Sequence, residues 1–266
     1  MKVRECYDIF ARNYDWSNRG DEWSEPWGGT RYLWSITIFP RIQSFLPSPH
    51  ILEIAPGFGR CTQFLKDLCD RLTVVDISEK CIHACQERFR DSGNISYVLN
   101  DGKSLDIIPD QSIDFVFSWD SLVHADNTVM NAYIKQLPRI MKPGAFGFIH
   151  HSNLAEYVDR STGTLMRKDL HSRDETMDSF LFLQYCNESG LHCLVQEKIA
   201  WRCNYLNDCF SVITYGHDNL RPQCSQIENY RFMEEAAFAR FVSKTYDFRN
   251  QMNIEDQNTP GSCITK

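Results

Sequence analysis

One stretch of the chain, residues 50–65, limits the possible folds more than any other: HILEIAPGFGRCTQFL. It begins with a short apolar run, which is typical of a central parallel strand covered on both faces. Gly57 and Gly59 follow, and their missing Cβ atoms let the backbone bend sharply and let a ligand approach the main chain. Residues 61–68 have helical spacing. A strand, a glycine turn and a helix in this order favour a nucleotide-type cofactor site at the carboxyl edge of a sheet.

Glu53 lies inside this apolar run. A buried carboxylate without a partner is costly, so a bound group that hydrogen-bonds to it explains the residue better than chance does. Glycine turns also join strands to helices in folds that bind no ligand. The choice between a cofactor site and a plain connection therefore depends on the rest of the chain.

The length and composition of the chain limit its domains and partners. With 266 residues, 42% of them hydrophobic, it can form one sizeable core with appendages but not two full α/β domains. A charge of −7 and the lack of a basic run argue against nucleic acid as the main partner. No apolar run approaches the roughly 20 residues of a membrane span, and residues 1–10 lack the apolar core of a signal peptide. We expect a soluble, cytoplasmic protein.

The eleven cysteines are scattered, often at apolar positions of expected helices and strands, and no two have Cys-x-x-Cys spacing. This distribution favours buried, reduced thiols over a disulfide framework or a zinc site.

After the opening stretch the chain alternates strand and helix. Strands are expected at residues 71–75, 95–99, 113–118 and 145–150. Helices are expected from Ser78 onward and over residues 127–141 and 175–189. This alternation predicts a doubly wound, parallel α/β sheet. Residues 191–201 and 209–215 then form two strands without a helix between them, which predicts an antiparallel hairpin.

Three regions follow from this pattern: residues 1–49, 50–216 and 217–266. The first is rich in aromatic residues, contains an expected helix at residues 30–45, and is expected to cap the core. Trp23 and Trp27, in a polar loop bounded by glycines, are instead expected to form a wall for the substrate. The last region is a tail with one amphipathic helix, residues 227–248, that packs on the core or on a partner subunit of a homodimer.

Asp76 ends the second expected strand, about 20 residues beyond the glycine turn, where an acidic residue can accept hydrogen bonds from ribose hydroxyls. The alternative is an ordinary Asp at the start of a helix. A dinucleotide dehydrogenase competes on these features, but its fingerprint needs a third glycine and six parallel strands, and the terminal hairpin argues against it.

The motif EIAPGFGR, Asp76, the Asn-Asp-Gly at residues 100–102 and the closing hairpin resemble a class I S-adenosylmethionine-dependent methyltransferase, over residues 46–216. Residues 23–29, 118–126 (SWDSLVHAD), 147–153 (GFIHHSN) and 207–211 (NDCFS) are similar to bacterial small-molecule methyltransferases found among glycan-modifying enzymes. Ala55 stands where the wider family often has glycine.

The resemblance implies a Rossmann-like, seven-stranded sheet, mostly parallel with one antiparallel strand. It also implies roles for residues at the strand ends. Glu53, Ala55, Gly57 and Gly59 would hold the methionine part of S-adenosylmethionine, Asp76 and Ile77 the ribose, Asp101 and Gly102 the adenine, and Ser118 and Trp119 would flank the sulfonium.

The family's strand order also brings polar residues together beside the methyl donor: Asp120, His124, His150, His151 and Asp208. In one interpretation a histidine takes the proton from an attacking substrate hydroxyl. In another, Asp120, His151 and Asp208 hold a divalent cation such as Mg²⁺, which binds a sugar diol; Asp208 would then also contact the substrate. In a third, these side chains only tie loops together.

Arg160, Arg167, Lys168 and Arg173 lie in a polar insertion, residues 154–174, and either meet an anionic substrate or form a solvated face. The expected activity is methyl transfer from S-adenosylmethionine to a hydroxyl of a sugar or glycan. The alternatives are O- or N-methylation of another small metabolite, or an inactive partner protein with a methyltransferase fold.

Overall fold

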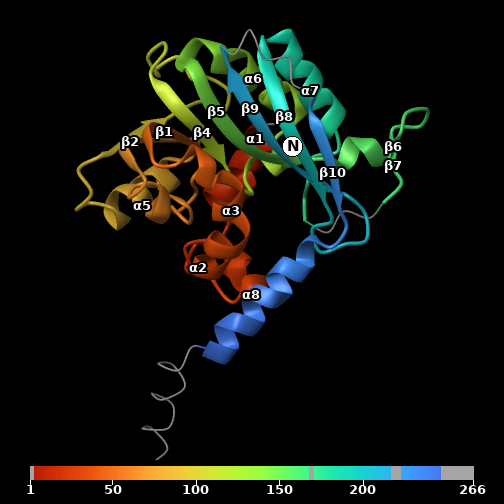
Figure 1. The fold of residues 1–266 in the computed structure, drawn as a ribbon, viewed down its shortest axis with the longest axis horizontal. Coiled ribbons are helices and arrows are strands. Elements are labelled where there is room, and N and C mark those ends of the chain that lie inside the picture. The colour runs from red at the N-terminus through yellow and green to blue at the C-terminus, as the bar shows by residue number, and fades with distance from the viewer. Residues whose placement is uncertain (1–2, 168–170, 217–222, 247–266) are drawn as a thin grey trace, which may run out of the picture.

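The computed structural model describes residues 3–167, 171–216 and 223–246. Within these residues, eight strands form one sheet with the order β10-β8-β9-β5-β4-β1-β2-β3 (Figure 1). The strands are β1 Ser48–Ile54, β2 Cys69–Asp76, β3 Ile95–Leu99, β4 Ile113–Ser118, β5 Met141–Ser152, β8 Leu191–Ile199, β9 Asp208–Tyr215 and β10 Ser225–Asn229. A separate short hairpin, β6 Val158–Asp159 and β7 Thr164–Leu165, lies in the polar insertion.

The α-helices between these strands are α4 Thr62–Leu65, α5 Glu79–Arg88, α6 Asn127–Ile140 and α7 Ser179–Glu188. Helix α8, Phe232–Tyr246, follows the last strand, β10. Aspartate or serine side chains cap three of these helices: Ser78 accepts a hydrogen bond from the backbone of α5, Asp126 from that of α6 and Asp178 from that of α7. These caps satisfy backbone N–H groups that the first helical turn leaves unpaired.

The predicted doubly wound sheet with an antiparallel strand is confirmed. β9 pairs antiparallel with both β5 and β8, whereas the other pairs in the sheet are parallel. The register places Asp208 opposite Ser152 and Cys209 opposite His151. The start of β9 therefore lies at the edge where β4 and β5 end.

The expected number of strands is wrong, because the sheet has eight strands rather than seven. The additional strand, β10, pairs in parallel with the outer edge of β8, in residues that we expected to begin the last helix. Polar pairing explains the difference: Gln226 donates to Gln196 and Asn229 to Glu197 across the two strands. The helix begins only at Phe232, and residues 247–248 of the expected helix lie outside the described residues.

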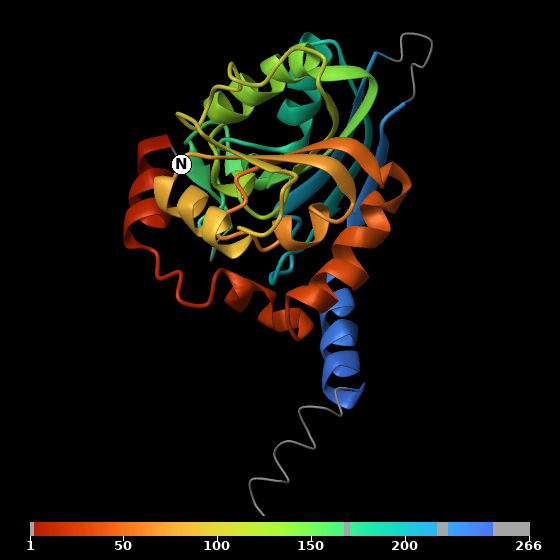
Figure 2. The same cartoon turned by 90° about the vertical axis from the view of Figure 1, so that its left-hand side faces the viewer.

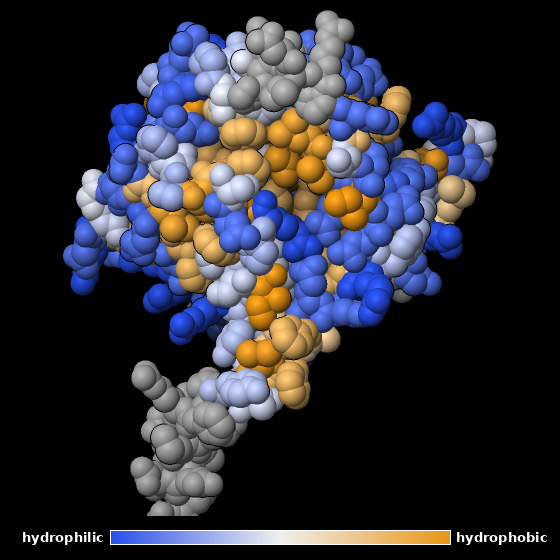
Figure 3. All heavy atoms as spheres, in the orientation of Figure 1, coloured by the Kyte–Doolittle hydropathy of each residue, from blue (hydrophilic) through white to orange (hydrophobic). Residues whose placement is uncertain are grey.

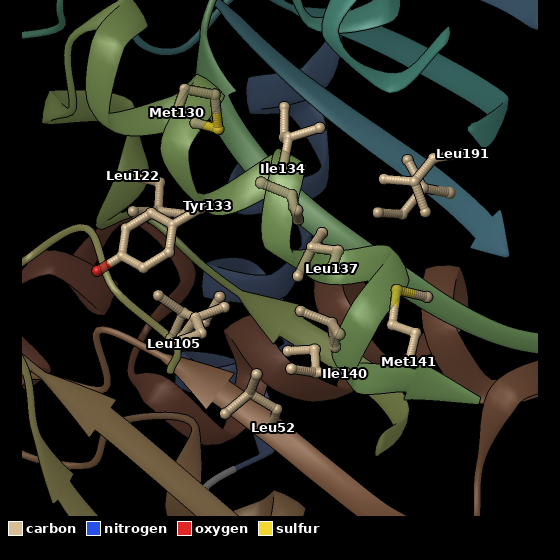
Figure 4. Packing of buried hydrophobic residues seen from close by; sticks show 14 of the residues in the cluster. Leu52, Leu105, Leu122, Met130, Tyr133, Ile134, Leu137, Ile140, Met141 and Leu191 are labelled. Carbon is tan, nitrogen blue, oxygen red and sulfur yellow. The ribbon is translucent and has the colours of Figure 1, made fainter. Parts of the chain in front are cut away.

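Alternate side chains of the strands build two apolar layers, one on each face of the sheet. On one face, α6 and α7 pack on residues such as Leu52, Val116 and Ile213. Figure 4 shows part of this layer, with Tyr133, Ile134 and Leu137 of α6 directed toward the same core. The strands are therefore covered on both sides, as their apolar runs predict.

The second layer lies under the amino-terminal region and α8. Ile51, Phe117 and Phe210 from the sheet pack there with Trp27, Trp34 and further side chains of both regions. The amino-terminal region follows the outside of the molecule from α5 to α8 (Figure 2). Its helical segments are α1 Val3–Cys6, a π-helical turn Tyr7–Asn13, a 3₁₀ turn Asp21–Trp27, α2 Thr30–Tyr32, a π-helical turn Leu33–Ile38, α3 Phe39–Ile42 and a 3₁₀ turn Gln43–Phe45.

The carboxyl-terminal helix α8 packs on this amino-terminal region and extends away from the sheet (Figure 1). Arg41 of α3 joins the elements, because it forms ion pairs with Glu197 of β8 at 2.7 Å and with Glu235 of α8 at 2.7 Å. Apolar atoms also appear on the outer surface of α8 (Figure 3), where Phe238 and Phe241 are exposed. None of the helices in the described ranges has the length and apolarity that crossing a membrane requires.

Candidate functional site

A cavity of about 450 Å³ lies at the carboxyl ends of β1, β2 and β4. Strained backbone conformations are concentrated there, because five of the six described non-glycine residues with positive φ line the cavity. They are Arg19, Ala55, Asp120, Ser172 and Arg202. Such conformations cost energy, and they persist where the surrounding structure holds them for a functional geometry. This edge of the sheet is therefore the candidate site.

Glu53 is buried at the floor of the cavity and receives one hydrogen bond there. The Thr62 hydroxyl donates to Glu53 Oε2 at 2.6 Å. Burial outweighs this bond and raises the pKa of Glu53 to about 8. The hydrogen-bonding partner expected for Glu53 is thus supplied in part by Thr62, and the carboxyl group holds a proton at neutral pH.

The glycine turn after β1 is held by the acid at the end of β2. The backbone N–H of Gly57 donates to Asp76 Oδ2 at 3.3 Å, and that of Ser78 donates to Asp76 Oδ1 at 2.8 Å. A Cβ on Gly57 would lie 2.9 Å from Trp16, and one on Gly59 would lie 2.4 Å from Phe89. The missing Cβ of Gly57 therefore leaves space in the cavity next to Trp16. Gly59 does not line the cavity, and its missing Cβ permits packing on Phe89.

The remaining residues expected to hold the cofactor divide into two groups. Ala55, Asp76, Ile77, Gly102 and Trp119 line the cavity, but Asp101 and Ser118 do not. The Asp101 carboxylate is exposed and caps the backbone N–H groups of residues 103 and 104, which lower its pKa. The Ser118 hydroxyl is buried and donates to the carbonyl oxygen of Ile54 at 3.0 Å.

Asp120 lies between two arginines at the end of β4. Arg60, just after the glycine turn, donates to Asp120 Oδ2 at 2.9 Å, and Arg173 donates to Asp120 Oδ1 at 3.1 Å. Burial opposes ionisation, but Arg173 and Arg60 outweigh it and lower the pKa of Asp120 to about 2. Asp120 is therefore an anion that joins the glycine turn to the residues before α7.

His150 and Asp208 continue this network behind the cavity wall. The backbone N–H of Asp120 donates to His150 Nδ1 at 3.1 Å, so the ring proton lies on Nε2, which donates to Asp208 Oδ2 at 3.1 Å. Arg173 also donates to Asp208, at 2.8 Å, and lowers the pKa of that carboxyl although burial opposes the shift. Both ring nitrogens of His150 are occupied, and neither His150 nor Asp208 lines the cavity.

His151 lies on the opposite face of the sheet from His150, because successive side chains of a strand alternate. Its ring stacks on Phe182 of α7 at 4.2 Å. Nδ1 donates to the carbonyl of Ser152 at 2.8 Å, and Nε2 pairs with the Ser211 hydroxyl at 2.8 Å. Burial is the main cause that lowers the pKa of His151 to about 4.

The structure does not assemble the expected metal site from Asp120, His151 and Asp208. A guanidinium group, that of Arg173, already lies between the two carboxylates, and His151 points to the other face. Within the ranges that the structure describes, no group of three or more His, Cys, Asp or Glu side chains is arranged to hold a metal ion. The nine cysteines whose side chains the structure describes are free thiols.

His124 is the predicted histidine that does line the cavity. It belongs to the short 3₁₀ turn Leu122–His124, and its Nδ1 lies 2.7 Å from the carbonyl oxygen of Ser172. A carbonyl accepts, so Nδ1 carries the proton and Nε2 is the basic nitrogen. Burial and then the charge of Arg173 lower the pKa of His124 to about 4. At neutral pH the ring is therefore neutral.

The two tryptophans expected to contact the substrate have different surroundings. Trp23 lines the cavity, where Arg60 lies 5.3 Å from its ring centre. Trp27 does not line the cavity but is fully buried in the core, and its Nε1 donates to the Thr37 hydroxyl at 2.8 Å. A third tryptophan, Trp201, lines the cavity just after β8. Aromatic side chains thus form part of the cavity wall, with Trp27 in the layer beneath.

Several cavity residues are absent from the sequence-based prediction. Tyr14 and Trp16 come from the amino-terminal region, which we expected to be a cap, and Trp16 stacks on Phe58 at 4.6 Å. Arg60 and Arg173 each have a signal in the sequence: one ends the glycine turn and the other belongs to the polar insertion. Arg173 is buried in ion pairs, whereas Arg160 and Arg167 are exposed and Lys168 lies outside the described residues.

Comparison with known proteins agrees with this geometry. Residues 51–144 match the family model of a methyltransferase domain. The structure of a protein from Pyrococcus horikoshii is similar over 79% of this chain and 98% of that one, with a TM-score of 0.56 and 20% identity. The chain has the class I methyltransferase fold. An S-adenosylmethionine-dependent methyltransferase from Clostridium acetobutylicum covers 79% of this chain and 99% of its own, with a TM-score of 0.55 and 16% identity.

Curated relatives of this chain are named for unlike acceptors. Phosphoethanolamine N-methyltransferase 1 of Triticum aestivum is 27% identical over 220 residues, which are 76% of this chain and 40% of the relative. Ribosomal RNA small subunit methyltransferase A of Geobacter metallireducens is 28% identical over 82 residues, 30% of each chain. The chain spans less than half of either relative. The matched family model describes a methyltransferase domain, and the names of these relatives carry no support for a sugar acceptor.

Proposed function

We propose that this protein transfers a methyl group from S-adenosylmethionine to a hydroxyl oxygen of a small acceptor, a sugar or glycan, with His124 as the general base. The single observation that carries this proposal is the position of the three histidines. His150 and His151 do not line the cavity. His124 lines the cavity as a neutral imidazole whose Nε2 is basic.

The residues at the cavity floor fit the cofactor. The methionine part of S-adenosylmethionine carries an ammonium group, which suits the buried Glu53 carboxyl, and the space next to Gly57 leaves room for its chain. Asp76 faces the same cavity and would accept hydrogen bonds from the ribose. When bound, the cofactor supplies an electrophilic methyl group on a sulfonium.

The protein's own residues would do the remaining work. His124 would take the proton from the acceptor hydroxyl as that oxygen attacks, a task for which a neutral imidazole is suited. The rings of Trp23 and Trp201 would contact the apolar face of a sugar ring. The network of Arg60, Asp120 and Arg173 would hold the surrounding loops in place, without metal coordination.

N-methylation of a small amine is the second candidate, and the similarity to phosphoethanolamine N-methyltransferase 1 favours it. An inactive partner protein is the third. A partner without activity has no need for a basic imidazole at the cavity wall, so the position of His124 favours an enzyme. Product analysis separates oxygen from nitrogen as the methylated atom, and binding of the cofactor product separates both from an inactive partner.

The test of the proposal is the substitution His124→Ala, with His83→Ala as the matched control because His83 is an exposed residue of α5. We expect kcat for an active hydroxyl acceptor to fall by about 10² to 10⁴, the usual contribution of a general base. The affinity for S-adenosylhomocysteine, measured by calorimetry, should stay within twofold in both variants. Wild-type turnover in His124→Ala would overturn the base assignment, and a loss of product binding would show a structural role instead.

A further inference from the structure

The short segment from His171 to Asp174 is tied to the loop after β4 by several contacts. Ser172 accepts from His124 Nδ1, and the backbone N–H of Asp174 donates to the carbonyl of Val123 at 2.9 Å. Ser172 has a φ of 55°, which a serine rarely adopts. Because the Ser172 backbone is strained, other contacts must hold its carbonyl group against the His124 imidazole.

Arg173, the next residue, forms ion pairs with two buried carboxylates. Its Nε lies 3.1 Å from both carboxylate oxygens of Asp208, and its Nη2 lies 2.8 Å from Asp208 and 3.1 Å from Asp120. The ring of Trp201 lies 5.4 Å below the guanidinium carbon. The Arg173 side chain is 4% exposed. A planar guanidinium can bind two carboxylates at once, so these contacts fix the backbone on either side of it.

We propose that Arg173 is the positioning residue for His124: its ion pairs with Asp208 and Asp120 hold the Ser172 carbonyl on Nδ1, which keeps the imidazole in the tautomer with a basic Nε2. This inference rests on the proposed role of His124. It assigns a function to a buried arginine of the polar insertion that cofactor binding does not require. Arg173 touches neither reacting atom in this account and acts through the orientation and tautomer of the histidine.

The charges around His124 give the expected direction of its titration. Burial and the positive charge of Arg173 favour the neutral ring, whereas the Ser172 carbonyl and the carboxylates of Asp120 and Asp208 favour the protonated ring. Arg60 neutralises part of the Asp120 charge. Removal of the Arg173 charge leaves the Asp208 and Asp120 carboxylates less compensated, so the pKa of His124 rises. The acidic limb of the rate profile then moves to higher pH, because a protonated imidazole cannot accept a proton.

The direct test is the tautomer of His124, observed by two-bond ¹H–¹⁵N correlation spectra of the full-length protein without cofactor or acceptor. His124→Asn identifies the resonance, and Arg173→Met, Arg173→Lys and the exposed control Arg160→Met are compared with the wild type. We expect the wild type and Arg160→Met to have the proton on Nδ1. Arg173→Met should give a mixture of tautomers and a higher His124 pKa, and Arg173→Lys a smaller change in the same direction.

The kinetic readout accompanies the spectra. We expect kcat to fall about a hundredfold in Arg173→Met, the lower end of a general-base contribution, with S-adenosylhomocysteine affinity unchanged and partial rescue in Arg173→Lys. An unchanged tautomer in Arg173→Met overturns the proposal. If that variant does not fold, an unchanged spectrum in Arg173→Lys overturns it. Wild-type turnover in His124→Ala instead contradicts the proposed function, and does so whatever the spectra of the arginine variants show.

Discussion

The two sides of the cavity are built from contacts of very different range. On the cofactor side, Glu53 is paired with Thr62 nine residues later, and Asp76 is paired with Gly57 nineteen residues earlier. On the acceptor side, Arg173 pairs with Asp120 and Asp208, 53 and 35 residues away. One side is a local turn, and the other is a network that exists only once the whole sheet has formed. We therefore expect substitutions on the two sides to differ in their effects on stability and on ligand binding.

The largest effect on stability is expected from Asp208→Ala. This change leaves Arg173 and His150 buried without the carboxylate that both contact, and removal of one partner of a buried ion pair typically costs about 3–5 kcal/mol. Asp101→Ala, at an exposed residue after β3 that does not line the cavity, is the control and should cost below about 1 kcal/mol. Chemical denaturation measures both. Similar losses in the two variants would contradict the contrast between the two sides.

Trp27 and Trp23 lie in the same 3₁₀ turn, and we expect their substitutions to change different properties of the protein. Trp27→Ala should lower the free energy of unfolding by about 3–5 kcal/mol, because it empties a fully buried site. Trp23→Ala should leave stability nearly unchanged and raise the acceptor KM about tenfold, a loss of about 1.4 kcal/mol of binding. Thermal unfolding and steady-state kinetics measure the two effects. An unchanged KM in Trp23→Ala would remove that residue from the acceptor site.

The next prediction depends on pH and concerns Glu53. Burial raises the pKa of Glu53 from its usual 4.5 to about 8 in the folded protein, so the folded state holds an extra proton between these values. Stability should consequently fall as pH rises through this window, by up to about 1.4 kcal/mol per pH unit. Glu53→Gln should flatten this dependence. Denaturation curves at pH 5, 6, 7 and 8 compare the two proteins, and equal slopes would contradict the raised pKa.

The raised pKa of the Glu53 carboxyl also predicts how ligand affinity depends on pH. If the ammonium of the ligand meets the Glu53 carboxylate, binding releases the proton, and affinity for S-adenosylhomocysteine should rise up to about tenfold per unit between pH 6 and 8. Calorimetry in buffers of different ionisation enthalpy counts the released protons. A pH-independent affinity would place the ammonium elsewhere.

The range of the contacts also explains what the sequence could predict. The strand, glycine turn and acidic tip are read from residues close in sequence, and the structure has them as predicted, with β9 antiparallel at the expected place. β10 was missed, because its pairing with β8 depends on cross-strand polar contacts rather than on an apolar pattern. Periodicity alone cannot distinguish such a polar edge strand from the start of a helix.

The candidate acceptor side shows a similar limit. The sequence brought Asp120, His150 and Asp208 together through the strand order, and the structure has them in contact. It did not indicate that Arg173 lies between the carboxylates, since an arginine in a polar insertion looks like a surface residue. The opposite directions of His150 and His151, by contrast, follow from the alternation of a strand and were available from the sequence.

The most direct test of the central claim identifies the atom that receives the methyl group. S-adenosylmethionine with a ¹³C-labelled methyl is incubated with the protein and a panel of sugars, glycans and small amines, and the products are analysed by ¹³C NMR and mass spectrometry. We expect a methyl carbon bonded to oxygen on a hydroxyl acceptor, and we expect its ¹³C signal to be lost in His124→Ala. A methyl group on nitrogen, or an oxygen-linked product formed at wild-type rate by His124→Ala, would contradict the proposed function.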